Sequence, residues 1–217
     1  MVKAAADMDA ETDTGRSAQK RRAILDAATG VFLKSGYLGT NMDEIAALSG
    51  VSKQTVYKHF SSKEALFVEI VSSLTNATGD LVHNDAPQLK DGELEAYLVA
   101  YAYRQLSAVL VPQIMQLRRL VIGEVGRFPE LARVLHERGP MRAITMLGGI
   151  FEGLRKQGLL QFDDAREAAG HFNWLVMSEA LNQAMLLGDK AIPRPADLRR
   201  QAEAGVRVFL AAYGAKR

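Results

Sequence analysis

Residues 51–66, VSKQTVYKHFSSKEAL, bring together the side chains in this sequence that are best suited to chemistry at a surface. Helical spacing predicts that Val56 and Phe60, four positions apart, face inward on one short helix. The opposite face then carries Lys53, Gln54, Tyr57 and Lys58, with Thr55 and His59 at its flanks. A face with two lysines and several hydrogen-bond donors suits a polyanion, and the alternative is an ordinary solvated helix with chance polar residues.

The residue types on this face match the needs of duplex DNA binding. A lysine ammonium donates to phosphate, while tyrosine and histidine hold donors on stiff rings. Lys53, Gln54 and Thr55 come first in the helix, which is the part that meets base edges in the major groove. Glutamine can pair with adenine, threonine can contact the thymine methyl group, and lysine can reach guanine.

Two short helices must position this face. The spacing Ala46-x3-Gly50-x5-Val56 matches the general helix-turn-helix pattern. Ala46 is small enough for the helices to approach, Gly50 supplies the turn, and Val56 is buried beneath the second helix. We therefore expect a helix-turn-helix unit whose second helix reads DNA.

Capping residues predict where these helices begin. Thr40 is expected to N-cap the first helix of the pair and Ser52 the second. Ser61 with Glu64 forms a capping-box pattern for the following helix, expected over 62–79.

Periodicity predicts helices along nearly the whole chain and no convincing strand. The sequence therefore predicts an all-α protein of about nine helices, with an N-terminal three-helix module and a larger helical domain. The other helices are expected at 17–35 with Gly36 as its cap, at 93–110, from Pro112 onward, at 140–157, at 163–187 and at 196–212, with breaks at 127–131 and 138–140.

Composition and charge limit the possible functions. The 217 residues include no cysteine, which excludes disulfides and thiolate metal sites. No apolar run reaches the roughly 18–20 residues of a membrane helix, so no membrane partner is expected. Residues 1–15 lack the apolar region of a secretory signal. We therefore expect a disordered leader and a cytoplasmic protein. Residues 16–63 hold eight Lys/Arg against three Asp/Glu, whereas residues 64–217 hold eighteen of each. The positive excess at one end favours a polyanion partner there.

Residues 21–67 resemble the DNA-binding domain of the TetR/AcrR family of transcriptional regulators. The matching features are the AA…F…G pattern of the first helix, GY…T, IA…GVSK, VY.HF and SKE.L, all at fixed spacing. The resemblance implies phosphate contacts by Thr40, Tyr57, His59 and Lys63 and base contacts by Lys53, Gln54 and Thr55; with Ser52 and Lys58 these form the predicted DNA-binding set. The basic residues 20–22 resemble a helix start near the DNA backbone. Gln54 departs from many members, which carry Gly or Ala there.

The resemblance further implies DNA binding over 16–63 and effector binding with dimerisation over 64–217, where 117–140 is similar to the C-terminal domain of one branch of AcrR-type regulators. A dimer is also expected because two recognition helices about 34–36 Å apart read successive major grooves. The expected homodimer interface lies on the last two helices: Phe172, Leu175, Val176, Leu186, Leu187, Leu198, Val206, Phe209 and Leu210. These residues can equally be the core of a monomer.

The expected effector-pocket residues, each of which can equally serve as core packing, are Tyr97, Tyr101, Met115, Arg118, Glu124, Met146, Phe151, Trp174 and Met177.

The sequence gives little support for an enzyme. The four histidines, at 59, 83, 136 and 171, are isolated from one another and from carboxylates at ligand spacing, so neither a metal nor another cofactor is expected.

Three hypotheses stand: a repressor that binds a palindromic operator and is released by a small, largely apolar effector; a DNA-binding regulator controlled by a protein partner or by concentration; and a helical protein that binds an apolar ligand and has an incidental basic end.

Overall fold

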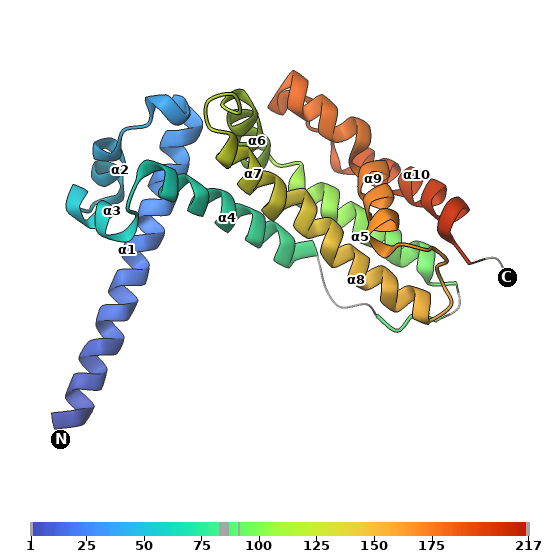
Figure 1. Ribbon diagram of the computed structural model, residues 1–217, viewed down its shortest axis with the longest axis horizontal. Helices are drawn as coiled ribbons and strands as arrows, with labels where there is room; N and C mark the ends of the chain where they lie inside the picture. Colours follow the sequence, from blue (N-terminus) through green and yellow to red (C-terminus); the bar gives the residue numbers. More distant parts are fainter. Residues whose placement is uncertain (1, 83–86, 91, 216–217) are drawn as a thin grey trace. The chain divides into compact units, whose positions relative to one another are not determined.

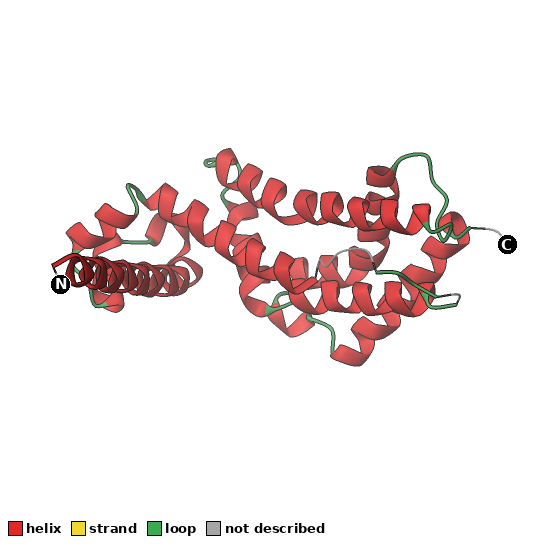
Figure 2. Ribbon diagram, turned by 90° about the horizontal axis from the view of Figure 1, so that it is seen from below, coloured by secondary structure: helices red, strands yellow, loops and turns green. Residues whose placement is uncertain are grey.

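The computed structural model describes residues 2–82, 87–90 and 92–215, and these are helical with no strand among them, which confirms the all-α expectation (Figure 2). The helices, labelled in Figure 1, are α1 Val2–Gly39, α2 Met42–Ser49, α3 Lys53–His59, α4 Lys63–Val82, α5 Leu94–Val109, α6 Pro112–Gly123, α7 Pro129–His136, α8 Arg142–Lys156, α9 Ala165–Leu187 and α10 Pro195–Tyr213. A π-helical turn, η1, spans Glu137–Met141, and a 3-10 turn, η2, spans Asp189–Ala191. In the described part of the chain no single helix is both long and apolar enough to span a membrane; only α5 and α6 taken together, a pair bent by 65°, meet the length and composition required.

The chain divides into two compact units, 1–71 and 72–217, and the division falls inside α4 rather than at the expected position 63/64. In the N-terminal unit α1 packs against α2 and α2 against α3. An aromatic cluster joins α1 to α4: the Phe67 ring lies 4.9 Å from that of Phe32 and 5.4 Å from that of Tyr37, both in edge-on contact. Burial of these rings holds the first part of α4 against α1.

The N-terminal end of α1 differs from expectation. The helix begins at Val2, so residues 2–15, expected as a disordered leader, are helical here. Alanine is frequent in this segment and favours helix, and the segment is continuous with the packed part of α1. Residue 1 lies outside the described residues. Near the C-terminal end of α1, Gly36 interrupts the helix with φ 72°. The sequence predicted a helix end at this glycine.

Three helix boundaries correct the sequence prediction. The Asn41 side chain, rather than that of Thr40, caps α2 by accepting from the Asp43 N–H. The Ser62 hydroxyl, rather than that of Ser61, accepts from the N–H of Ala65 at the start of α4. At 138–140 the chain does not break, because the π-helical turn η1 accommodates Pro140 between α7 and α8.

In the C-terminal unit α10 packs against α5 and α9, and α8 packs against α9 (Figure 1). The centre of this unit is aromatic: the Phe172 ring makes edge-on contacts with those of Tyr101, Phe151 and Phe209 at centroid distances of 5.9, 5.6 and 5.1 Å. α9 and α10 come especially close at Gly205, where an added Cβ would lie 3.3 Å from the carbonyl oxygen of Leu175.

This core corrects part of the expected dimer interface. Five of its nine residues are buried inside the protomer and are unable to contact a partner: Phe172, Val176, Leu198, Val206 and Phe209. Leu175 and Leu210 are half-buried, whereas Leu186 and Leu187 are 75% and 71% exposed. Two further apolar side chains of α9 and α10, Trp174 and Val208, are more than half exposed. Helical periodicity finds apolar faces, but it does not tell a core face from an interface.

A break divides α9 at Ser178, whose backbone has φ 6° and ψ −112°. Such a break frees carbonyl groups from the helical hydrogen-bond ladder. The Gln201 side chain of α10 donates to the carbonyl oxygen of Val176 at 2.8 Å and lies 3.0 Å from the Ser178 hydroxyl. The distant α10 therefore stabilises the break in α9.

Candidate DNA-binding surface and effector cavity

The turn between α2 and α3 follows the helix-turn-helix pattern residue by residue. Gly50 adopts the left-handed conformation, φ 69° and ψ 24°, and Val51 N–H donates to the carbonyl oxygen of Ala46 at 3.2 Å. Ser52 caps α3 by accepting from the N–H of Thr55 at 3.1 Å. Val56 is fully buried and Ala46 nearly so. The expected roles of Ala46, Gly50, Ser52 and Val56 in the turn are all confirmed.

One face of α3 is open to solvent. Its exposed residues are Lys53, Gln54, Tyr57 and Lys58, with Thr55 and His59 half-buried at the flanks, as the periodicity predicted. Tyr57 keeps 44% of its surface exposed although it is a large aromatic residue. Since the inner face is closed by Val56 and Phe60, this polar face is available to a ligand.

Two residues at the start of α3 are held by short-range contacts. Lys53 Nζ lies 2.8 Å from a carboxylate oxygen of Asp43 on α2, and the hydrogen bond to Asp43 raises the pKa of this ammonium. The Ser52 and Thr55 hydroxyls are 2.8 Å apart. These contacts position side chains that we expect to approach bases.

Two other members of the predicted set face the protein. Thr40 is buried, and its hydroxyl donates to the carbonyl oxygen of Gly36 at 2.7 Å. Lys63 Nζ donates to the carbonyl oxygen of Tyr37 at 2.9 Å and lies 4.9 Å from the centre of that ring. Both residues stabilise the chain where Gly36 interrupts α1, so their phosphate contacts stay predictions. In the basic segment 20–22, Arg21 forms an ion pair with Glu69 of α4 at 2.7 Å.

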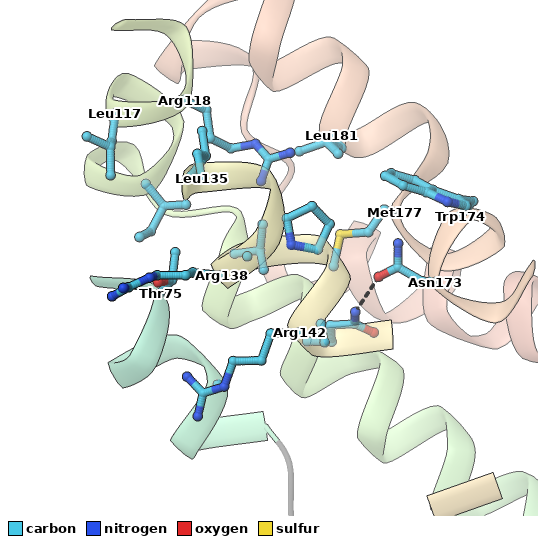
Figure 3. Close-up of a pocket in the computed structure, with 17 residues that line it drawn as sticks. Thr75, Leu117, Arg118, Leu135, Arg138, Arg142, Asn173, Trp174, Met177 and Leu181 are labelled. Carbon is cyan, nitrogen blue, oxygen red and sulfur yellow. Dashed lines mark hydrogen bonds between the residues drawn. The ribbon is translucent and has the colours of Figure 1, made fainter. Parts of the chain in front are cut away.

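The C-terminal unit contains a cavity, seen in Figure 3, among the second half of α4, α5, α6, α7, η1, α8 and α9. It has about 770 Å³ of empty space including its open mouth. Its walls are mainly apolar, with Leu117, Leu135, Met177 and Leu181 among them. A cavity of this kind, apolar with a few convergent polar groups, is the usual form of a small-molecule site.

A buried amide pair forms part of the cavity wall. Gln105 of α5 donates to the side-chain oxygen of Asn173 of α9 at 2.8 Å, the bond drawn dashed in Figure 3, and both residues are 3% exposed. The second oxygen or nitrogen of each amide, Gln105 Oε1 and Asn173 Nδ2, is buried without a partner. If both amides were flipped, the pair would still bond and would still leave one N–H donor group and one carbonyl acceptor unused.

Arg118 of α6 is the most unusual cavity residue. Its guanidinium group lies among the lining side chains, toward Leu181 (Figure 3), and its Nε is buried without a hydrogen-bond partner. Burial lowers the pKa of this group, although arginine stays charged at neutral pH. The neighbouring Arg119 contrasts with it, because Arg119 pairs with Asp189 and donates to the carbonyl oxygen of Ala184 at 2.8 Å.

Three of the nine expected pocket residues line this cavity: Arg118, Trp174 and Met177. Tyr101, Met115 and Phe151 are buried in the core instead, and Tyr97, Met146 and Glu124 are half-buried elsewhere, with Glu124 Oε2 lying 3.8 Å from Arg127. The sequence interpretation missed Gln105 and Asn173, although a polar residue inside an apolar helical stripe was an available signal. It also missed Thr75, Arg138 and Arg142, which reach the cavity only through tertiary packing.

No group of three or more histidine or acidic side chains suited to a metal ion occurs in the part of the chain that the structure describes.

Comparisons with known proteins agree with both halves of this picture. Residues 24–70 match the model of the bacterial regulatory proteins of the tetR family, and residues 96–215 match the C-terminal domain of AefR-like transcriptional repressors. The solved structure of a protein from Mesorhizobium loti MAFF303099, described as a TetR-family transcriptional regulator, is 37% identical with a TM-score of 0.84, covering 92% of this chain and 98% of the other. That of the Flavonoid-responsive Regulator FrrA is 33% identical with a TM-score of 0.76, covering 92% and 100%.

Two curated relatives match over about a quarter of the chain. The uncharacterized HTH-type transcriptional regulator YhgD of Bacillus subtilis is 45% identical over 58 residues, 27% of this chain and 30% of YhgD. The HTH-type transcriptional regulator RutR of Escherichia coli K12 is 42% identical over 55 residues, 25% of this chain and 26% of RutR. The chain thus covers less than a third of the length of either relative.

Proposed function

Because the chain belongs to the TetR family of bacterial regulatory proteins and is a DNA-binding transcriptional regulator rather than an enzyme, we propose that it is a repressor that binds a palindromic operator as a homodimer and leaves it when a small molecule fills the cavity. The observation that carries the proposal is the pairing, in one chain, of an exposed polar α3 face with a mainly apolar cavity in the other unit. The match of 96–215 to an AefR-like repressor domain supports repression as the output.

The DNA-binding residues of the proposal are those of α3 and its cap. Lys53, Gln54 and Thr55 contact base edges, and Tyr57, Lys58 and His59 contact phosphates. Ser52 positions Thr55 through the hydroxyl contact. Thr40 and Lys63 support this surface through their contacts with the end of α1 and keep phosphate as a second, weaker role.

The dimer of the proposal forms through the outer surface of α9 and α10. Five expected interface residues belong to the core, so the proposed interface keeps the other four and adds one exposed residue of α10: Leu175, Leu186, Leu187, Leu210 and Val208. Two copies of such a helix pair would close into a four-helix bundle.

In this proposal, a ligand acts on the DNA-binding unit through α4. This helix is continuous across the unit boundary, and its second half contributes Thr75 and Gly79 to the cavity wall. A ligand that binds better to one α4 position than to another would shift the population of protomer arrangements. A small rotation of each DNA-binding unit is enough to mismatch two successive grooves.

The test is fluorescence anisotropy with DNA that flanks the gene of this protein, and with scrambled DNA as the control, at two salt concentrations. We expect tight binding to the flanking DNA alone, saturation at two chains per site, and weakening with salt. Compounds are then sought that both release DNA and raise the melting temperature. Saturation at one chain per site would refute the dimer, and a compound that stabilises the protein without releasing DNA would refute the coupling.

A further inference from the structure

Arg118 gives the cavity a positive charge that no described acidic residue neutralises. Arg118 forms no ion pair or hydrogen bond within the described residues, and the described lining includes no aspartate or glutamate. Arg118 is half-buried and its Nε is fully enclosed, and a charge partly removed from water in this way is stabilised by an opposite charge beside it. The partner of Arg118 is therefore to be sought in a ligand.

One further arginine adds to the positive potential of the same cavity. Arg138 donates to the Ser72 hydroxyl of α4. Ser72 is neutral, so this hydrogen bond orients the guanidinium group without cancelling its charge. Two cations on one mainly apolar cavity favour an anion over a neutral or cationic ligand.

The other lining residues indicate the chemistry of the rest of the ligand. Trp174, Met177 and Leu181 offer an indole, a thioether and an aliphatic surface, which suit an apolar body. The amide pair of Gln105 and Asn173 offers one unused donor and one unused acceptor, whichever way the amides are turned.

We propose that the effector is an apolar molecule with a single anionic group, such as a carboxylate or an ionised phenol, that binds Arg118 while its body lies against Trp174 and Met177. The guanidinium fork suits an anionic group with oxygen acceptors, which can accept two hydrogen bonds from it. This inference rests on the proposed function, since it assigns the chemistry of the effector to the same cavity.

A matched pair of probes tests the charge separately from the shape. 1-Anilinonaphthalene-8-sulfonate and N-phenyl-1-naphthylamine share one ring system, and only the first carries an anion. Trp174 is the only tryptophan of the chain and lines the cavity, so energy transfer from tryptophan to either probe reports binding there. We expect the full-length protein to bind the sulfonate at least tenfold more tightly than the neutral probe.

Variants assign the preference to Arg118. Arg118→Met should weaken sulfonate binding about tenfold or more and leave binding of the neutral probe unchanged, while Arg118→Lys should recover part of the loss. Arg207→Met, at an exposed arginine of α10, is the matched control and should change neither affinity. Equal affinity of the two probes for the unmodified protein, an equal loss of both probes in Arg118→Met, or the absence of sulfonate binding would each overturn the inference.

DNA binding separates this inference from the proposed function. If the sulfonate binds through Arg118 but the operator complex persists, the anion site stands and the ligand coupling fails. If a neutral compound releases the operator and binds equally well to Arg118→Met, the repressor stands and the anion site fails.

Discussion

Removing the hydroxyl of Tyr57 tests the proposed DNA surface with little disturbance of the fold. The ring is 44% exposed on α3, so Tyr57→Phe should leave the melting temperature unchanged. A hydrogen bond to a charged group contributes roughly 1.5–3 kcal/mol, and a dimer loses two of them. At the lower limit this is about 3 kcal/mol, or roughly 140-fold in Kd. Because a phosphate contact carries no sequence information, the loss should be nearly equal for operator and scrambled DNA.

The adjacent Lys58 provides the matched comparison. Lys58→Met should also weaken binding to all sequences, but in addition it removes one charge per protomer. The slope of log K against log salt should therefore become less steep by roughly 2 for the dimer, whereas Tyr57→Phe should keep the full slope. Titrations by fluorescence anisotropy at four salt concentrations measure both quantities. If Tyr57→Phe altered the preference between sequences, or reduced the salt slope as Lys58→Met does, the assignment of Tyr57 to phosphate would be refuted.

Four further changes test other parts of the molecule. Gln54→Ala, on the exposed α3 face, should change the preference at particular base pairs in a panel of single-base operator variants, and an unaltered profile would remove Gln54 from the base-contacting set. Gly50→Ala forces a side chain into φ 69° and should lower the free energy of unfolding by about 1–2 kcal/mol in urea titrations; equal stability would contradict the turn conformation. Phe172→Ala empties the centre of the aromatic core and should cost about 3–5 kcal/mol, whereas an interface role would instead leave a stable monomer. Hydrogen bonds from Arg119 and Gln116 hold the pKa of the Asp189 carboxyl below its usual 3.8, so its stabilisation is present above that pH and is lost as the pH falls through the lowered value. Asp189→Asn should therefore be less stable than the original protein at pH 7, and the difference in melting temperature should shrink below about pH 3.8; a difference independent of pH would refute the ionic contribution.

The helix-turn-helix could be predicted from sequence because it is specified locally. Gly50 needs a left-handed turn, Ser52 caps the next helix three residues before its partner N–H, and Val56 lies one helical turn from Phe60. Each relation extends over a few residues. The two capping errors were also local: Asn41 and Ser62 stand beside Thr40 and Ser61, and all four residues are of types that can cap a helix. The choice between neighbours depends on where the preceding chain turns, which capping residues alone do not specify.

The cavity of the C-terminal unit could not be predicted in the same way, because its residues come from segments far apart in the sequence. Arg118 and Arg119 are adjacent and chemically identical, yet Asp189 pairs with Arg119 and leaves Arg118 to the cavity. Gln105 is 68 residues from Asn173, and only their contact shows that each amide keeps an unused group.

The break in α9 is a further feature of the cavity that the sequence pattern does not predict. The residue at the break is a serine, Ser178, rather than a proline or glycine. The sequence pattern therefore predicts one straight helix from Asp164 to Leu187. Gln201, on α10, bonds the carbonyl group that the break exposes. The lining residues Trp174 and Met177 precede the break and Leu181 follows it, so the break determines how these three side chains are presented to the cavity. A straight α9 would rotate Leu181 relative to Trp174 and Met177, and therefore a contact between α9 and α10 helps to shape a site to which α10 contributes no described residue.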